Sequence, residues 1–118
     1  MSNNPLSAIP MSPFQASENL LFLSGQLALD ENGKITGDIE QQTEQCLKNI
    51  QKILQSQGRD MGDIVKTTVW LTNKANTAGY NAAYRRFFGD GPYPARSTVI
   101  SGLVLDEALI EIEVIAKR

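Results

Sequence analysis

The sequence contains no histidine among its 118 residues, and this absence excludes several kinds of active site. Imidazole is the usual base of serine and cysteine hydrolases and a common ligand of zinc, so Ser-His-Asp, Cys-His and HExxH sites are excluded. Cysteine is nearly absent too, since Cys46 is the only one. A single cysteine forms neither an intrachain disulfide nor a cysteine-rich zinc site. Any chemistry must come from carboxylates, Arg, Lys, hydroxyls and backbone groups.

The sequence also lacks a strong net charge and a long hydrophobic run. Its 11 Lys and Arg and 13 Asp and Glu leave a net charge of -2, which is not that of a protein built to bind a phosphate backbone. The apolar run at residues 20–23 is far too short to cross a bilayer, and the first residues show no secretory signal. We therefore expect a cytoplasmic protein with neither a nucleic-acid nor a membrane partner.

The length and hydrophobic content suit one compact domain, because 118 residues of which 42% are hydrophobic can bury a sizeable core. No internal repeat or linker divides the chain, so we assign residues 1–118 to a single domain. Residues 1–19 contain Pro5, Pro10 and Pro13 and are expected to form an irregular N-terminal arm.

The hydrophobic pattern predicts two helices and several strands. Apolar residues recur at three- and four-residue spacing from Ile39 to Leu54, and Gly58 follows as a terminator. The remaining predicted elements are a helix over about 77–88, strands at 20–23, 64–71, 96–101 and 108–116, and a hairpin that joins 27–29 to 34–35. The order ββαβαββ is that of an α+β domain with both helices on one face of the sheet.

Two helices leave the other face of such a sheet uncovered, and the pattern indicates that this face is not wholly polar. In the last predicted strand, Leu109 and Ile115 share it with Glu111, and Trp70 of the 64–71 strand adds apolar surface. A face of this kind is usually covered by association, so we predict an oligomer.

Arg96 and Glu111 are the residues best suited to chemistry. If the two last strands are neighbours, Glu111 can lie on the same sheet face as Arg96. A half-buried arginine needs an anionic partner, and two interpretations stay open. The pair is either a structural ion pair that fixes strand register, or an arginine that binds a ligand carboxylate beside a glutamate that transfers protons.

Three further residues stand out in the predicted elements. Gly25 follows a predicted strand and marks either a strand end or a place where a ligand approaches the backbone. Cys46 lies on the apolar stripe of the first helix and is expected to be a small core residue. Asn81 lies off the aromatic face of the second helix, where it can reach a subunit boundary.

Five segments, in order along the chain, resemble the RidA/YjgF family of reactive-intermediate deaminases. They are residues 23–26 (LSGQ), 62–69 (GDIVKTTV), 80–88 (YNAAYRRFF), 91–98 (GPYPARST) and 110–116 (IEIEVIA). The resemblance implies a chorismate-mutase-like α+β fold and a homotrimer whose sheets pack inward, with ligand clefts between subunits. It also implies hydrolysis of enamines and imines such as 2-aminoacrylate to 2-oxo acids and ammonia, without metal or organic cofactor.

The same resemblance implies roles for four residues. Arg96 matches the arginine that clamps the substrate carboxylate, and Glu111 matches the glutamate that holds or activates the attacking water. Gly25 matches a backbone contact near the ligand, and Asn81 matches a polar residue of the cleft.

Two of the departures from the family pattern concern candidate site residues. Phe14 stands where members often have tyrosine, so a ring can still cover the ligand but without a hydroxyl. Thr98 stands where many members have cysteine, so a hydroxyl that can bond a ligand replaces the thiol.

Two other functions stay open. The chain could be a non-catalytic trimeric module that binds 2-oxo acids or amino acids in the same cleft. RNA cleavage or translation inhibition, an activity also reported within the family, is less favoured because the net charge is -2 and no basic run exists.

Overall fold

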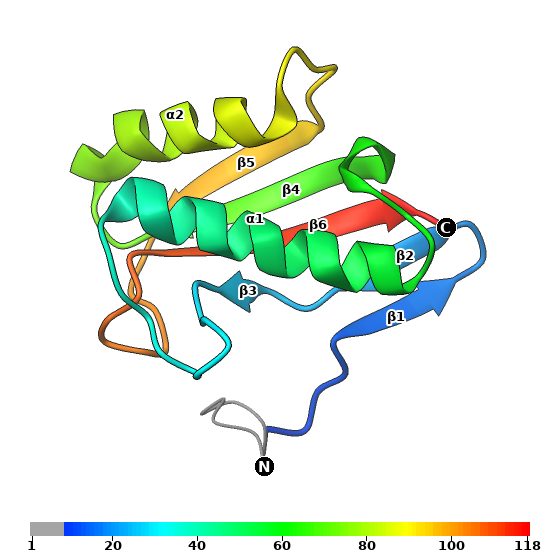
Figure 1. Cartoon of the computed structure of the whole chain (residues 1–118), viewed down its shortest axis with the longest axis horizontal. Helices are drawn as coiled ribbons and strands as arrows, with labels where there is room; N and C mark the ends of the chain where they lie inside the picture. The colour runs from blue at the N-terminus through cyan, green and yellow to red at the C-terminus, as the bar shows by residue number, and fades with distance from the viewer. Residues whose placement is uncertain (1–8) are drawn as a thin grey trace.

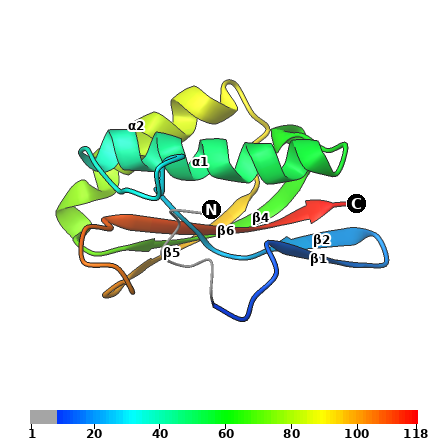
Figure 2. The same ribbon diagram turned by 60° about the horizontal axis from the view of Figure 1, so that its bottom comes forward.

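The computed structural model describes residues 9–118, so the part of the predicted arm that contains Pro5 lies outside the described residues. A six-stranded sheet carries two helices, α1 (Ile39–Ser56) and α2 (Thr77–Phe88), on one face (Figures 1 and 2). Short 3-10 turns at Met61–Asp63 and Lys74–Asn76 precede β4 and α2. The predicted α+β class and both predicted helices are confirmed. No helix within residues 9–118 has the length and apolar character needed to cross a membrane.

The sheet has the strand order β1-β2-β6-β4-β5, with β3 also paired to β6. The strands are β1 (Phe14–Ser17), β2 (Leu20–Leu23), β3 (Gln26–Leu27), β4 (Ile64–Leu71), β5 (Ala95–Ile100) and β6 (Ile110–Lys117). Among the described strands only β4 and β5 pair in parallel, and β5 forms one edge of the sheet. The last two strands of the chain are therefore not neighbours, because β4 lies between them (Figure 1).

The structure corrects two predictions near the N-terminus. The arm is not irregular throughout, because residues 14–17 contain no proline and pair with β2 as an antiparallel hairpin. Residues 27–29 and 34–35 do not form the predicted hairpin, since Leu27 pairs with Glu111 of β6. Asp30 Oδ1 accepts bonds from the backbone N–H groups of Asn32 and Lys34, which closes a local turn without a second strand.

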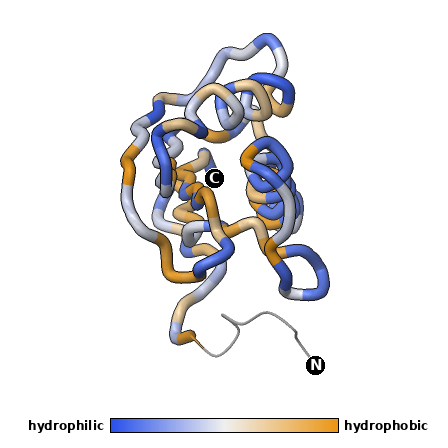
Figure 3. Tube along the Cα trace, turned by 90° about the vertical axis from the view of Figure 1, so that its left-hand side faces the viewer, coloured by the Kyte–Doolittle hydropathy of each residue, from blue (hydrophilic) through white to orange (hydrophobic). Residues whose placement is uncertain are grey.

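The core lies between the sheet and the helices. On α1, the stripe predicted from residue spacing is buried, and Cys46, Leu47, Ile50 and Leu54 are all 0% exposed. Apolar stretches of the sheet and helices alternate with polar ones along the tube in Figure 3. The Cys46 thiol donates a long bond to the carbonyl of Ile110 (3.8 Å), which confirms its place as a small core residue.

The start of α1 is tied to the loop before β6 by a buried glutamine. Gln42, 2% exposed, donates from Nε2 to the carbonyls of Gly37 (3.1 Å) and Glu107 (3.2 Å). Its Oε1 accepts a bond from the backbone N–H of Leu109 at 2.9 Å. These three bonds fix where α1 begins relative to β6, which carries Glu111.

The sheet face opposite the helices is uncovered in the single chain, as expected from the sequence (Figure 2). Phe22 and Val99 are 41% and 43% exposed there, and Leu20 and Val65 also leave large apolar surfaces in solvent. The oligomer that would cover this face stays a prediction.

Candidate active site

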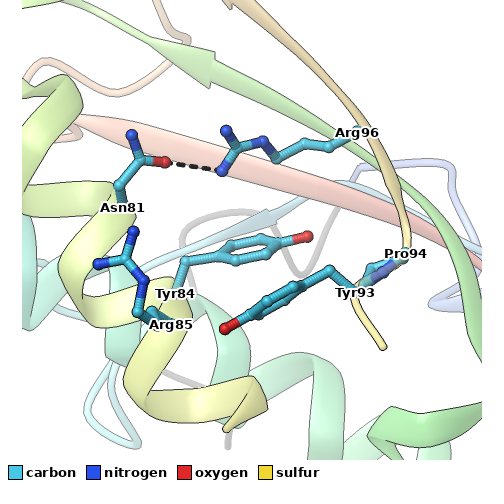
Figure 4. Close-up of a pocket in the computed structure, with 6 residues that line it drawn as sticks. All are labelled: Asn81, Tyr84, Arg85, Tyr93, Pro94 and Arg96. Atoms are coloured by element: carbon cyan, nitrogen blue, oxygen red, sulfur yellow. Dashed lines mark hydrogen bonds between the residues drawn. The ribbon is translucent and has the colours of Figure 1, made fainter. Parts of the chain in front are cut away.

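Arg96 extends from β5 toward α2, where one amide and two aromatic rings hold its guanidinium. Its Nη1 donates to Asn81 Oδ1 at 2.7 Å (Figure 4). Its Cζ lies 5.0 Å from the ring centroid of Tyr80 and 5.2 Å from that of Tyr84, a cation–π arrangement. None of these contacts neutralises the positive charge.

A cleft of about 330 Å³ opens beside this guanidinium. It is lined by Asn81, Tyr84, Arg85, Tyr93, Pro94 and Arg96 (Figure 4). The ion pairs found among residues 9–118 join Lys48 to Glu44 and Arg86 to Glu40, so no described acid compensates Arg96. A ligand carboxylate can occupy this place and accept two parallel N–H bonds from the fork of the guanidinium.

The tyrosines beneath Arg96 are bonded to threonines of the sheet. The Tyr84 hydroxyl lies 2.9 Å from Thr67 Oγ1. The pKa of Tyr84 is raised, mainly by burial, although this bond and the charge of Arg96 lower it. The Tyr80 hydroxyl lies 2.7 Å from Thr98 Oγ1. Thr98 therefore bonds within its own chain and is not among the residues that line the cleft; its predicted contact with a ligand stays a prediction.

Glu111 lies on the opposite face of the sheet from Arg96. In β4, Thr67 is the partner of Arg96, whereas Trp70 is the partner of Glu111. Residues three apart in a strand point to opposite faces. The expectation that Glu111 shares the face of Arg96 is therefore wrong. β4 lies between β5 and β6, and the partners of Arg96 and Glu111 in β4 are three residues apart.

Glu111 has a cleft of its own on the uncovered face, of about 210 Å³, between Trp70 and residues 101–104. Its carboxylate lies against the backbone of Gly25, where any added Cβ would overlap Glu111 Oε2. Burial raises the pKa of Glu111, and the nearby charge of Glu113 raises it further. A carboxyl group in this condition exchanges protons closer to neutral pH than a free glutamate does.

The structure thus joins four of the six predicted residues as two pairs, Arg96 with Asn81 and Glu111 with Gly25. Phe14 belongs to neither pair, because it is the strand partner of the buried Leu23 and packs against the core. Gly25 lies where β2 ends and β3 begins, so the strand-end interpretation holds for its local structure. Within residues 9–118, no group of three or more His, Cys, Asp or Glu side chains could hold a metal ion.

Two residues that line the Arg96 cleft, Arg85 and Tyr93, were not predicted from the sequence. A signal for Arg85 existed, because it follows Asn81 by four residues on a predicted helix and so shares its face. Tyr93 lies in the turn before β5 and donates its hydroxyl to the carbonyl of Gly89 (2.7 Å), a contact that the sequence did not indicate.

The family model described as Endoribonuclease L-PSP matches residues 1–118. The chain belongs to this family. One curated L-PSP relative is the chloroplastic Reactive Intermediate Deaminase A of Arabidopsis thaliana, 42% identical over 114 residues, which are 95% of this chain and 60% of that protein. Another, from Lactococcus lactis, is described as a candidate regulator, AldR; it is 48% identical over 101 residues, 83% of this chain and 79% of that protein.

Solved L-PSP structures have the same fold. The E. coli YjgF gene product superposes with a TM-score of 0.89 at 34% identity, over 98% of this chain and 94% of that one. E. coli TdcF with bound serine also has a TM-score of 0.89, at 31% identity and the same coverage. These relatives confirm the RidA/YjgF resemblance drawn from the sequence and the α+β fold it implied.

Proposed function

We propose that the chain is a cofactor-independent deaminase that hydrolyses enamines and imines of 2-amino acids, such as 2-aminoacrylate, to 2-oxo acids and ammonia. The observation that carries the proposal is the guanidinium of Arg96, which faces a cleft and has no described acidic partner. The descriptions of two relatives are consistent with this class of reaction and substrate. One is named a reactive intermediate deaminase, and another holds serine, a small molecule with one carboxylate.

The proposed site is formed between two copies of the chain in a homotrimer. Arg96 with Asn81 and Glu111 with Gly25 lie on opposite faces of one sheet, so a single chain cannot bring them to one substrate. A trimer whose uncovered sheet faces turn inward would bury Phe22 and Val99. Each copy would then supply Arg96 to one site and Glu111 to the next.

In the proposed reaction, Arg96 binds the substrate carboxylate and so orients the neighbouring imine carbon. Glu111 of the second copy accepts a proton from water, whose oxygen forms a bond to that carbon. The π electrons of the C=N bond move to nitrogen, which takes this proton from Glu111, and a carbinolamine forms. Its hydroxyl proton then passes to nitrogen, the C–N bond breaks, ammonia leaves and the C=O bond of the 2-oxo acid forms. An enamine first takes a proton at its terminal carbon, which Glu111 can donate because its pKa is raised.

Subunit mixing tests both the residues and the shared site. Arg96→Ala and Glu111→Ala should each abolish the release of 2-oxo acid from imines generated by an amino-acid dehydratase or oxidase. In trimers assembled at random from equal amounts of the two variants, about a quarter of all sites would combine both intact residues, so about a quarter of wild-type activity should return.

The control for Arg96→Ala is Arg86→Ala, which removes an arginine that pairs with Glu40 and does not line the cleft. It should keep wild-type activity. No acceleration by the wild-type protein, or an undiminished rate in Arg96→Ala, would contradict the deaminase proposal. Two inactive variants without recovery on mixing would contradict the shared site.

A second candidate is a regulatory module that binds 2-oxo acids without turnover, and the relative described as a candidate regulator favours it. In that case 2-oxobutanoate would raise the melting temperature while no imine is hydrolysed. RNA cleavage accords with the family's description but not with the net charge of -2, and RNA binding that is absent or insensitive to salt would dismiss it.

A further inference from the structure

The cleft beside Arg96 contains a second guanidinium. Arg85 lies on α2 one turn after Asn81, and it lines the same cleft from the helix, whereas Arg96 enters it from β5 (Figure 4). Within residues 9–118 it has no acidic partner at ion-pair distance, whereas its neighbour Arg86 pairs with Glu40 at 2.9 Å. The other lining residues are uncharged, so two positive charges face one cleft.

The polar groups that remain available in the cleft are nearly all hydrogen-bond donors. Guanidinium groups only donate. Asn81 Oδ1 already accepts from Arg96, which leaves its amide N–H groups. The Tyr84 hydroxyl is bonded to Thr67, and the Tyr93 hydroxyl donates to the carbonyl of Gly89, so its oxygen can still accept while the two guanidinium groups supply most of the donors. A ligand that satisfies this lining must be rich in acceptors and negatively charged.

We propose that the cleft selects substrates with two acidic groups, namely imines and enamines of amino acids whose side chain ends in a carboxylate. Arg96 binds the carboxylate next to the imine carbon, and Arg85 binds the distal one. A ligand with one carboxylate compensates only one of the two facing charges, whereas a dicarboxylate compensates both. The proposal rests on the proposed function in taking Arg96 as the carboxylate clamp, and it adds the substrate class.

Calorimetric titration of the assembled protein with two 2-oxo acids tests the selection apart from turnover. Wild-type protein should bind 2-oxoglutarate about tenfold more tightly than 2-oxobutanoate, as expected for one added charge-assisted contact. Arg85→Gln should reduce the ratio of the two affinities to about one. Arg86→Gln makes the same change of charge one residue away, outside the cleft, and should keep the wild-type ratio.

Equal affinities in the wild-type protein would overturn the proposal. So would an equal loss of 2-oxoglutarate affinity in Arg85→Gln and Arg86→Gln, because general surface charge would then explain the binding. Inorganic phosphate is the control anion, and phosphate that competes as well as 2-oxoglutarate would also overturn it.

Turnover is measured in parallel on imines generated by oxidation of glutamate and of alanine. Hydrolysis of both at equal kcat/KM would overturn the selection and leave the deaminase function intact. Absence of all hydrolysis, with the Arg85-dependent preference for 2-oxoglutarate retained, would refute the deaminase function and support the ligand class.

Discussion

At the scale of single residues, Arg96 and Glu111 have opposite electrostatic environments. The guanidinium is held by Asn81 and by two aromatic faces, and no described acid neutralises its charge. The carboxyl group is half-buried near a like charge, and both conditions raise its pKa. One residue is therefore suited to binding an anion, and the other to exchanging a proton.

The raised pKa of Glu111 predicts the acid side of the pH profile for imine hydrolysis. A base must be ionised to accept a proton, so kcat/KM should fall as Glu111 is protonated, beginning at a higher pH than for an ordinary glutamate of pKa about 4.3. Glu113→Gln removes one cause of the raised pKa and should move this fall to lower pH. Glu31→Gln, in an exposed turn, should not, and an unmoved profile in Glu113→Gln would contradict the role of Glu111 as base.

The Tyr80–Thr98 bond predicts a measurable coupling in stability. Tyr80 is 0% exposed, so Thr98→Val leaves a buried hydroxyl without its partner and should lower the free energy of unfolding by about 1–3 kcal/mol. Tyr80→Phe in the Thr98→Val background should restore part of the loss. A double-mutant cycle in urea measures the coupling, and strictly additive effects would show that the bond contributes nothing.

At the scale of elements, hydrophobic spacing was sufficient to predict both helices and most strands, because burial against the sheet is what creates that spacing. The partners of the strands were not predictable from local pattern, and the assumption that the last two strands are neighbours misplaced Glu111. The β4–α2–β5 segment did carry a usable signal. A strand, a helix and a strand in succession usually give parallel neighbours, which places β5 beside β4.

The position of α1 relative to β6 should depend on Gln42. Gln42→Met preserves the length of the side chain but removes three bonds and leaves the N–H of Leu109 unpaired, so unfolding should become easier by about 2 kcal/mol. The matched control, Gln55→Met, changes an exposed glutamine on the same helix and should change the free energy of unfolding by less than about 0.5 kcal/mol. Equal effects in the two variants would contradict this role of Gln42.

At the scale of the whole molecule, the uncovered sheet face and the proposed shared site both require a second copy of the chain. The sequence indicated the apolar face from alternation in the last strand, and the structure adds that Arg96 and Glu111 cannot meet within one chain. Association would cover the apolar sheet face and would bring Arg96 of one copy close to Glu111 of another.

A charge placed on this sheet face should therefore dissociate the proposed trimer and, for the same reason, abolish deaminase activity. Phe22 is 41% exposed, so Phe22→Glu costs a single chain little and should give a folded monomer by circular dichroism and light scattering. Gln55→Glu adds the same charge on the outer side of α1 and should keep the wild-type assembly. A Phe22→Glu variant that is monomeric and fully active would show that one chain suffices.

β5 is exposed at each of its six residues and pairs only with β4 among the described strands. A free strand edge of this kind recruits strands from other molecules, and charged residues and proline are what hinder such recruitment. Here Arg96 lies within β5 and Pro94 directly precedes it. A charged side chain at position 96 should therefore also hinder polymerisation through β5, and apolar replacements at this position should favour fibrous or amorphous aggregates whether or not a substrate is ever bound.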